Sequence, residues 1–299
     1  MLKEDAVCPV CRSEGRHVRT LRELLMGTGD EFGQRFCKSC GIYFLSPRIR
    51  EIDIDHYYPP DYTGYLQHLH PLLIRTITHK LGLDGRRRRM IERYLPGGRL
   101  LDVGVGSGFF LKTLDPKKWE RFGVDTAWNP GDWENEEVAR YEGKFDETPL
   151  PLHQLDAITM WHVFEHFYHP DQALANAHEI LKPGGFLFIA VPDLKNLDRR
   201  LFGRFWVGWD APRHIAIYSR SSLKTMLLQN GFELCSIHHS SYTGDYFLLN
   251  LEFLQRGLNR SPLRLSQSLV LRILLSPFLW GLAGIGLAPI KMYVSKKQI

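Results

Sequence analysis

The stretch that decides the fold is LLDVGVGSG at positions 100–108, an apolar run that leads into three glycines at alternate positions. The apolar part predicts a buried β-strand, and the glycines predict a tight turn whose backbone a ligand can approach closely. A helix is expected from Phe109 onward. Nicotinamide and flavin enzymes use a similar turn to bind a pyrophosphate at a helix N-terminus, so the glycines alone do not identify the ligand.

Two carboxylates next to this turn favour one class of ligand. Asp102 would repel a pyrophosphate, whereas it would attract a sulfonium cofactor that carries an ammonium group and no phosphate. Asp125 ends the next predicted strand, where an acidic side chain can accept both hydroxyls of an adenosine ribose. The pair favours S-adenosylmethionine, and a nicotinamide oxidoreductase is the least favoured alternative.

Apolar strand-like runs and helical patterns alternate from Arg99 onward. Helices are expected at 171–181 and 219–230, each followed by glycine. The expected strands occupy 100–103, 121–124, 139–142, 157–161, 186–191, 233–238 and 291–295. The alternation predicts an α/β fold, with a Rossmann-like, seven-stranded and mostly parallel sheet that has helices on both faces.

Three more motifs follow in chain order, namely DAITMW at 156–161, HVFEH at 162–166 and LKPGG at 181–185. Together with the glycine stretch and Asp125, they resemble the class I S-adenosylmethionine-dependent methyltransferase family over residues 86–240. The resemblance implies that the glycine loop and Asp102 hold the methionyl end of the cofactor, that Asp125 holds the ribose, and that 161–165 closes over it. The implied cofactor-binding residues are Asp102, Gly104, Gly106, Ser107, Gly108, Asp125, Asp146, Trp161, His162 and Glu165.

The adenine contact departs from the family pattern. Family members usually carry an acidic or amide side chain after the third strand, and this chain has GKFD at 143–146. Either Asp146 serves from a shifted position, or Phe145 presents only its backbone. Val105, where many relatives have a small or sulfur-bearing residue, puts little in doubt.

Four of the five cysteines form two pairs, Cys8 with Cys11 and Cys37 with Cys40. Two Cys-x-x-Cys pairs at this separation predict four thiolates around one structural zinc ion, with four unmetallated buried thiols as the alternative. Cys235 lies in an apolar run and is expected to be buried. Paired cysteines of this kind and an N-terminus without a signal-peptide pattern predict a cytoplasmic location.

The chain is expected to divide into a zinc ribbon at 1–50, a linker with cap helices at 51–95, and a methyltransferase domain at 96–299. The ribbon and the string YYP at 57–59 resemble the ribbon prefixed to a bacterial subset of these methyltransferases. In that subset the ribbon is similar to that of sugar C-methyltransferases, which implies a small-molecule or glycan acceptor. Tyr57, Tyr58 and Tyr62 are candidates for the roof of the substrate pocket, with core packing as the alternative.

Methyl transfer is an in-line displacement that needs alignment, and a base only if the nucleophile carries a proton. The candidate catalytic residues are His162 and His166 beside the cofactor loop, and His214 in the string WDAPRH, which resembles a segment of the same subset. The alternative for His214 is a loop-fixing role. HVFEH also spells an inverted zinc-peptidase motif, which its position after a buried strand disfavours.

An apolar insertion is expected at about 245–288, and its residues 273–290 carry no charge. Two prolines and three glycines in that segment argue against a spanning helix. We expect either a helical lid over an apolar pocket or a patch at 269–290 that makes peripheral membrane contact, helped by Arg260, Arg264 and Arg272. A lipid-linked acceptor fits both.

The composition is that of a globular protein, since 44% of the 299 residues are hydrophobic and 24% are charged. The predicted function is methyl transfer from S-adenosylmethionine to a small molecule or glycan; the pattern does not indicate the acceptor atom or the oligomeric state. One alternative is an RNA methyltransferase, because a zinc ribbon and the run 86–89 suit a polyanion. The excess of basic over acidic residues, 38 to 33, is too modest to make nucleic acid the expected partner. Another alternative is a non-catalytic nucleotide-binding zinc-ribbon protein.

Overall fold

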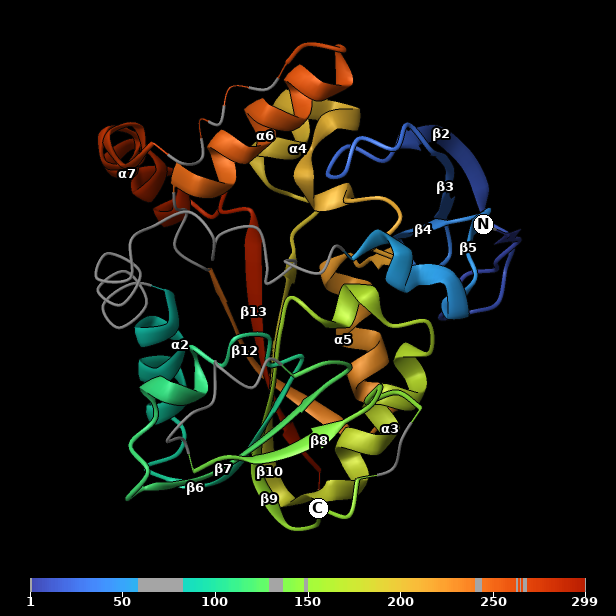
Figure 1. The fold of residues 1–299 in the computed structure, drawn as a ribbon. Coiled ribbons are helices and arrows are strands. Elements are labelled where there is room, and N and C mark those ends of the chain that lie inside the picture. Colours follow the sequence, from blue (N-terminus) through green and yellow to red (C-terminus); the bar gives the residue numbers. More distant parts are fainter. Residues whose placement is uncertain are drawn as a thin grey trace.

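The computed structural model describes residues 2–298 except 59–82, 129–136, 148–149, 240–243, 262, 264, 266 and 267. Tyr62 and Arg264 therefore lie outside the described residues. Figure 1 shows a large central sheet, with the N-terminal ribbon (blue) and the helices α4, α6 and α7 at the end of the sheet where β13 begins.

The central sheet has seven strands in the order β12-β13-β10-β9-β6-β7-β8. Neighbours from β10 to β8 are parallel, and β13 is antiparallel to both β10 and β12. The strands are β6 Gly98–Val103, β7 Trp119–Asp125, β8 Ala139–Glu142, β9 Leu155–Trp161, β10 Leu181–Pro192, β12 Phe232–His239 and β13 Ile290–Lys297. All seven predicted strands are present, and the predicted fold class is confirmed.

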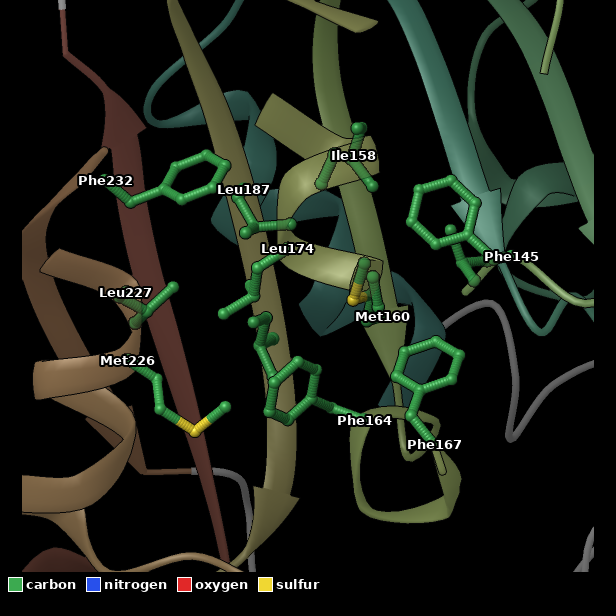
Figure 2. Packing of buried hydrophobic residues seen from close by; sticks show 14 of the residues in the cluster. Phe145, Ile158, Met160, Phe164, Phe167, Leu174, Leu187, Met226, Leu227 and Phe232 are labelled. Carbon is green, nitrogen blue, oxygen red and sulfur yellow. The ribbon is translucent and has the colours of Figure 1, made fainter. Parts of the chain in front are cut away.

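Helices cover both faces of this sheet. On one face, α3 and α5 place Leu174, Met226 and Leu227 against Ile158 and Leu187, as Figure 2 shows. On the other face, α2 buries residues 90 and 91 against alternate residues of β6, β9 and β10. The helices are α2 Leu83–Glu92, α3 Pro170–Ile180, α4 Leu197–Phe202, α5 Arg220–Gln229, α6 Gly244–Gly257 and α7 Leu269–Gly284. Burial of alternate residues on each face produces the near-continuous apolar strands seen in the sequence.

The helix expected from Phe109 is not formed. The chain makes turns and a short 3-10 helix at Leu111–Thr113 instead. The physical reason lies in Asp115 and Pro116, because the residue before a proline is disfavoured in helical conformation and leaves too few residues for an α-helix.

The ribbon sheet contains a strand from far along the chain. Its order is β11-β4-β3-β2, and β11 (Ala216–Ile217) pairs with β4 two residues after His214. The remaining strands are β2 Arg16–Arg22, β3 Glu31–Cys37 and β4 Ile42–Leu45, while β1 Lys3–Glu4 pairs with β5 Arg48–Ile49. The ribbon and the methyltransferase part of the chain therefore share one hydrogen-bonded sheet.

Arg213 links the same two parts electrostatically. Its side chain is fully buried and contacts Asp210 Oδ1 at 2.6 Å and Glu23 Oε1 at 3.1 Å, both through Nη2. Its Nη1 donates to the carbonyl oxygen of Tyr57 at 3.0 Å. One guanidinium thus connects the ribbon, the short 3-10 helix η1 (Glu51–Tyr57) and the loop that carries His214.

The carboxyl-terminal part of the chain contains two helices and an exposed cysteine. The segment expected as an apolar insertion contains the helices α6 and α7. Cys235, expected to be buried, is exposed, because β12 is an edge strand and odd-numbered side chains in it point to solvent. None of the helices in the described part of the chain is both long and apolar enough to cross a bilayer.

Candidate active site

The glycine loop follows β6 at the carboxyl edge of the parallel strands. Gly104, Gly106 and Gly108 have φ values of +68°, +54° and +71°, a region that favours glycine. A Cβ at Gly104 would lie 2.3 Å from Val163, so the loop packs directly on the segment 162–166. A Cβ at Gly106 would meet no atom of the described residues within 4 Å. The loop therefore leaves room for a ligand above Gly106.

The two predicted carboxylates lie on either side of this loop. Asp125 Oδ2 accepts a hydrogen bond from the backbone N–H of Gly106 at 2.7 Å, and burial raises the pKa of Asp125. Asp102 is only 2% exposed, and its Oδ1 accepts from Thr159 Oγ1 at 2.5 Å. Asp125 thus ends next to the loop surface, whereas the Asp102 carboxylate sits beneath it and supports it from within the sheet.

Two buried donors near the loop have no hydrogen-bond partner among the described residues, namely Ser107 Oγ and Trp161 Nε1. Such atoms are rare unless a ligand or water satisfies them. Trp161 also packs edge-to-face on Phe110, with ring centroids 5.3 Å apart. An open glycine turn, a carboxylate beside it and unsatisfied donors fit an adenosine cofactor with an amino-acid tail.

The predicted adenine side lies in the turn after β8. Asp146 is 4% exposed, accepts from the backbone N–H of His169 at 3.3 Å, and has its pKa raised by burial. The carbonyl oxygen of Phe145 already accepts from Asn176 Nδ2 at 2.7 Å.

The three candidate catalytic histidines meet around one carboxylate. Glu165, in the 3-10 helix η5 (Phe164–His166), is fully buried, with His162 Nδ1 at 3.5 Å and His214 Nε2 at 4.0 Å from Oε1. The rings of His166 and His214 stand edge-to-face with centroids 4.8 Å apart. We call these four residues the histidine cluster. Residues 48 positions apart in sequence are brought together because β11 returns the chain to η5, where Ile215 N–H bonds the Glu165 carbonyl.

The electrostatics of the histidine cluster follow from burial and mutual proximity. Burial lowers the pKa of His166 to about 4, so this ring is neutral. Burial acts to raise the pKa of Glu165, but His162 and His214 beside it outweigh burial and hold the pKa below its ordinary value. His214 Nδ1 lies 2.8 Å from the carbonyl oxygen of Gly208 and donates to it, and Nε2 faces Glu165.

Two further residues, Tyr58 and Arg213, contact the histidine cluster or the loop that carries His214. Tyr58 Oη lies 2.9 Å from His166 Nδ1, a direct contact with the site rather than only a place in a pocket roof. Arg213 holds the His214 loop from behind. The strings YYP and WDAPRH contain Tyr58 and Arg213 and had drawn attention to both segments. The sequence does not show that the two segments meet at the same site.

The four paired cysteines form a second cluster. The Sγ atoms of Cys8, Cys11, Cys37 and Cys40 all lie within 4.8 Å of one another. Cys11 Sγ and Cys37 Sγ are 3.4 Å apart, too far for a disulfide and close to the roughly 3.8 Å edge of a tetrahedron with Zn–S bonds of about 2.3 Å. This donor set fits zinc.

The family follows from comparison with known proteins. Residues 66–237, more than half of the chain, match the family model described as a methyltransferase domain. The chain therefore belongs to this methyltransferase family. It is an enzyme of S-adenosylmethionine-dependent methyl transfer.

Solved structures agree on the fold. The complex between the Haloferax volcanii Trm112 methyltransferase activator and a putative methyltransferase matches at 15% identity, over 84% of this chain and 100% of that chain, with a TM-score of 0.50. A SAM-dependent methyltransferase from Archaeoglobus fulgidus matches at 19% identity, over 76% and 100% of the two chains, with a TM-score of 0.49. At 15% identity, the likeness to the Haloferax volcanii complex shows the fold alone. A search of curated proteins finds no match.

Proposed function

We propose that this methyltransferase modifies a small molecule or glycan whose acceptor atom lies against the histidine cluster. The observation that carries the proposal is the close approach of Gly104 to Val163, the residue after His162, which supports a position of the cluster beside the cofactor loop. In-line transfer requires the nucleophile to approach the methyl carbon from the side opposite the sulfur. The cluster is the group of titratable side chains best placed to bind and orient that nucleophile.

We assign the cofactor contacts to Asp125 for the ribose, Asp146 for adenine, and Ser107 with the glycine loop for the methionyl end. Bound S-adenosylmethionine supplies an electrophilic methyl group. The chain's own contribution is to orient the cofactor through these residues and to exclude water from the acceptor side with Trp161 and Tyr58. Asp102 supports the loop through its bond with Thr159.

A small acceptor is favoured over RNA by the arginine run on α2. Arg87 lies over the Trp161 ring at 4.9 Å, and Arg88 Nε is 4.0 Å from Glu92. Two of the four arginines thus have local partners, which reduces the charge available to a polyanion. An RNA substrate would show a steep loss of activity with salt, whereas a neutral acceptor would not.

Two finer assignments complete the proposal. The four cysteines hold one structural zinc ion, since their four Sγ atoms fill all four coordination positions of the ion and leave none open for substrate.

Helix α7 makes peripheral contact with a membrane, since its exposed face is apolar. On this face Val270, Ile273, Leu274 and Phe278 are 61–69% exposed at helical spacing. Exposure of this face favours the surface patch over the lid.

The test combines cofactor titration with single variants of the zinc-replete protein. We expect micromolar binding of S-adenosylmethionine, at least tenfold weaker for Asp125→Ala. Asp171→Asn, a surface carboxylate paired with Arg12, is the matched control and leaves affinity unchanged. His214→Asn is expected to abolish transfer from labelled cofactor in an acceptor screen while cofactor affinity persists.

Absence of binding to the wild-type protein, or equal affinity in Asp125→Ala, would refute the cofactor assignment. Full transfer by His214→Asn would refute the acceptor assignment alone.

A further inference from the structure

The carboxylate of Glu165 is an anomaly in the fold. It is fully buried, and neither oxygen has a hydrogen-bond partner among the described residues. The nearest basic atom is His162 Nδ1, at 3.5 Å. A buried charge without hydrogen bonds is strongly unfavourable unless a cation compensates it.

Each of the two histidines near this carboxylate has one ring nitrogen held by a hydrogen-bond partner. His214 donates from Nδ1 to the Gly208 carbonyl and turns Nε2 toward Glu165. His166 is engaged at Nδ1 by the Tyr58 hydroxyl, which leaves Nε2 as the nitrogen that can bind. Histidines that ligate metals are held in this way, because the bond at one nitrogen fixes the tautomer and the ring orientation at the other.

We propose that Glu165, His166 and His214 bind a divalent transition-metal ion, at a site separate from the four cysteines. One ligand atom from each residue lies within 4.8 Å of the other two. Bonds of about 2.1 Å require spacings of about 3–3.5 Å, which small side-chain movements achieve. Two imidazoles and one carboxylate with open positions are typical of manganese, iron, cobalt or zinc rather than calcium.

The local charge permits a cation here. Arg213 is a fixed positive charge that acts on His166, but it is bound by the two carboxylates of Asp210 and Glu23. This group carries one net negative charge, and Glu165 adds another. The peptidase-like reading of HVFEH is not involved, since η5 is a 3-10 turn and His214 comes from another part of the chain.

The metal site narrows the class of acceptor molecule. This inference about the acceptor rests on the proposed function. Three protein ligands leave positions for an acceptor that binds through oxygen, so the substrate is a hydroxyl compound such as a vicinal diol of a glycan. A bound cation lowers the pKa of a hydroxyl that contacts it, and the proton passes to His162, the histidine of the cluster that is not a ligand. The oxygen is then held beside the cofactor loop as the nucleophile.

The experiment is a manganese titration of protein loaded with one equivalent of zinc per chain, in which electron paramagnetic resonance reports free Mn²⁺. The four thiolates bind this single zinc in preference, so the nitrogen and oxygen ligands stay open to Mn²⁺. We expect one Mn²⁺ per chain for wild type, and at least a tenfold loss of affinity for Glu165→Gln and His214→Asn. Tyr58→Phe keeps all three ligands and is expected to weaken binding about tenfold through loss of orientation.

The matched control is His153→Gln, an exposed loop histidine that is expected to bind Mn²⁺ as wild type does. Cofactor titration of each variant shows that it is folded. Wild type that binds cofactor but no Mn²⁺ overturns the metal site and leaves the proposed function standing. Equal Mn²⁺ affinity in wild type and Glu165→Gln, or an equal loss in His153→Gln, also overturns it, whereas failure to bind cofactor would count against the proposed function instead.

Discussion

At the scale of single residues, one buried carboxyl makes the stability of the fold depend on pH. Asp198 on α4 is fully buried and accepts a hydrogen bond from Asn250 Nδ2 of α6 at 2.9 Å. Asn250 in turn accepts from the backbone N–H of Val207 at 2.8 Å. Burial raises the pKa of Asp198 to about 7. The carboxyl therefore stays protonated in the folded state at pH values where it is ionised in the unfolded chain.

This shift predicts a pH-dependent stability. Between the unfolded pKa of 3.8 and the folded pKa of about 7, the native state holds an extra proton, so stability falls as pH rises through this window. Asp198→Asn removes the effect. Relative to wild type, we expect this variant to gain roughly 2 kcal/mol in unfolding free energy between pH 5 and pH 8. Urea unfolding at both pH values measures it; a difference that does not change with pH would contradict the assignment.

At the scale of elements, the pairing of β11 with β4 couples the ribbon to the acceptor side of the site. Ala216 and Ile217 are paired with Phe44 and Tyr43 of β4, the strand that lies between β11 and β3. Cys37 ends β3, the next strand of the same sheet. Loss of metal at the cysteines is therefore expected to loosen the loop that carries His214.

Replacement of Cys37 by serine tests this coupling. We expect one zinc ion per wild-type chain by elemental analysis, loss of that zinc in Cys37→Ser, and faster amide hydrogen exchange at residues 214–217. Cys235→Ser is the control, because Cys235 is exposed on the far edge strand β12. Unchanged exchange at 214–217 in a zinc-free variant would show that the ribbon does not position the site.

At the scale of the whole molecule, the exposed face of α7 lies at the end of the sheet where the active site is built. Because β13 is antiparallel to β10, its first residues adjoin the carboxyl end of β10, and α7 leads into them (Figure 1). Residues 253–299 contain arginines and lysines but no Asp or Glu. An apolar face flanked by positive charge suits an anionic lipid surface.

Vesicle flotation tests the membrane contact. We expect the protein to float with vesicles that contain phosphatidylglycerol, less so in high salt, and binding to fall severalfold in the double variant Ile273→Ser, Leu274→Ser. Leu228→Ser, an exposed leucine on α5, is the control. Equal flotation of all three proteins, or none by wild type, would exclude α7 as the contact.

The sequence predicted the local features because their causes are local. Alternating strand and helix patterns located the seven strands, and the glycines at 104, 106 and 108 indicated a turn whose φ values the structure shows to be positive. The predicted helix at Phe109 was wrong because the prediction followed the strand-turn pattern before it. Asp115 and Pro116, which end any helix there after a few residues, were not taken into account. Cys235 was misplaced because an apolar run does not reveal which strand lies at an edge.

By itself, the sequence indicated the fold class, the cofactor class and the two Cys-x-x-Cys pairs, since each is built from short motifs and local patterns that can be recognised in chain order. Only the tertiary structure placed His214 beside Glu165 and His166, and Tyr58 against His166. It also showed that β11 and Arg213 join the ribbon to the active-site loop. These contacts span tens to hundreds of residues, and their geometry comes from strand order and buried charge, which no local pattern encodes.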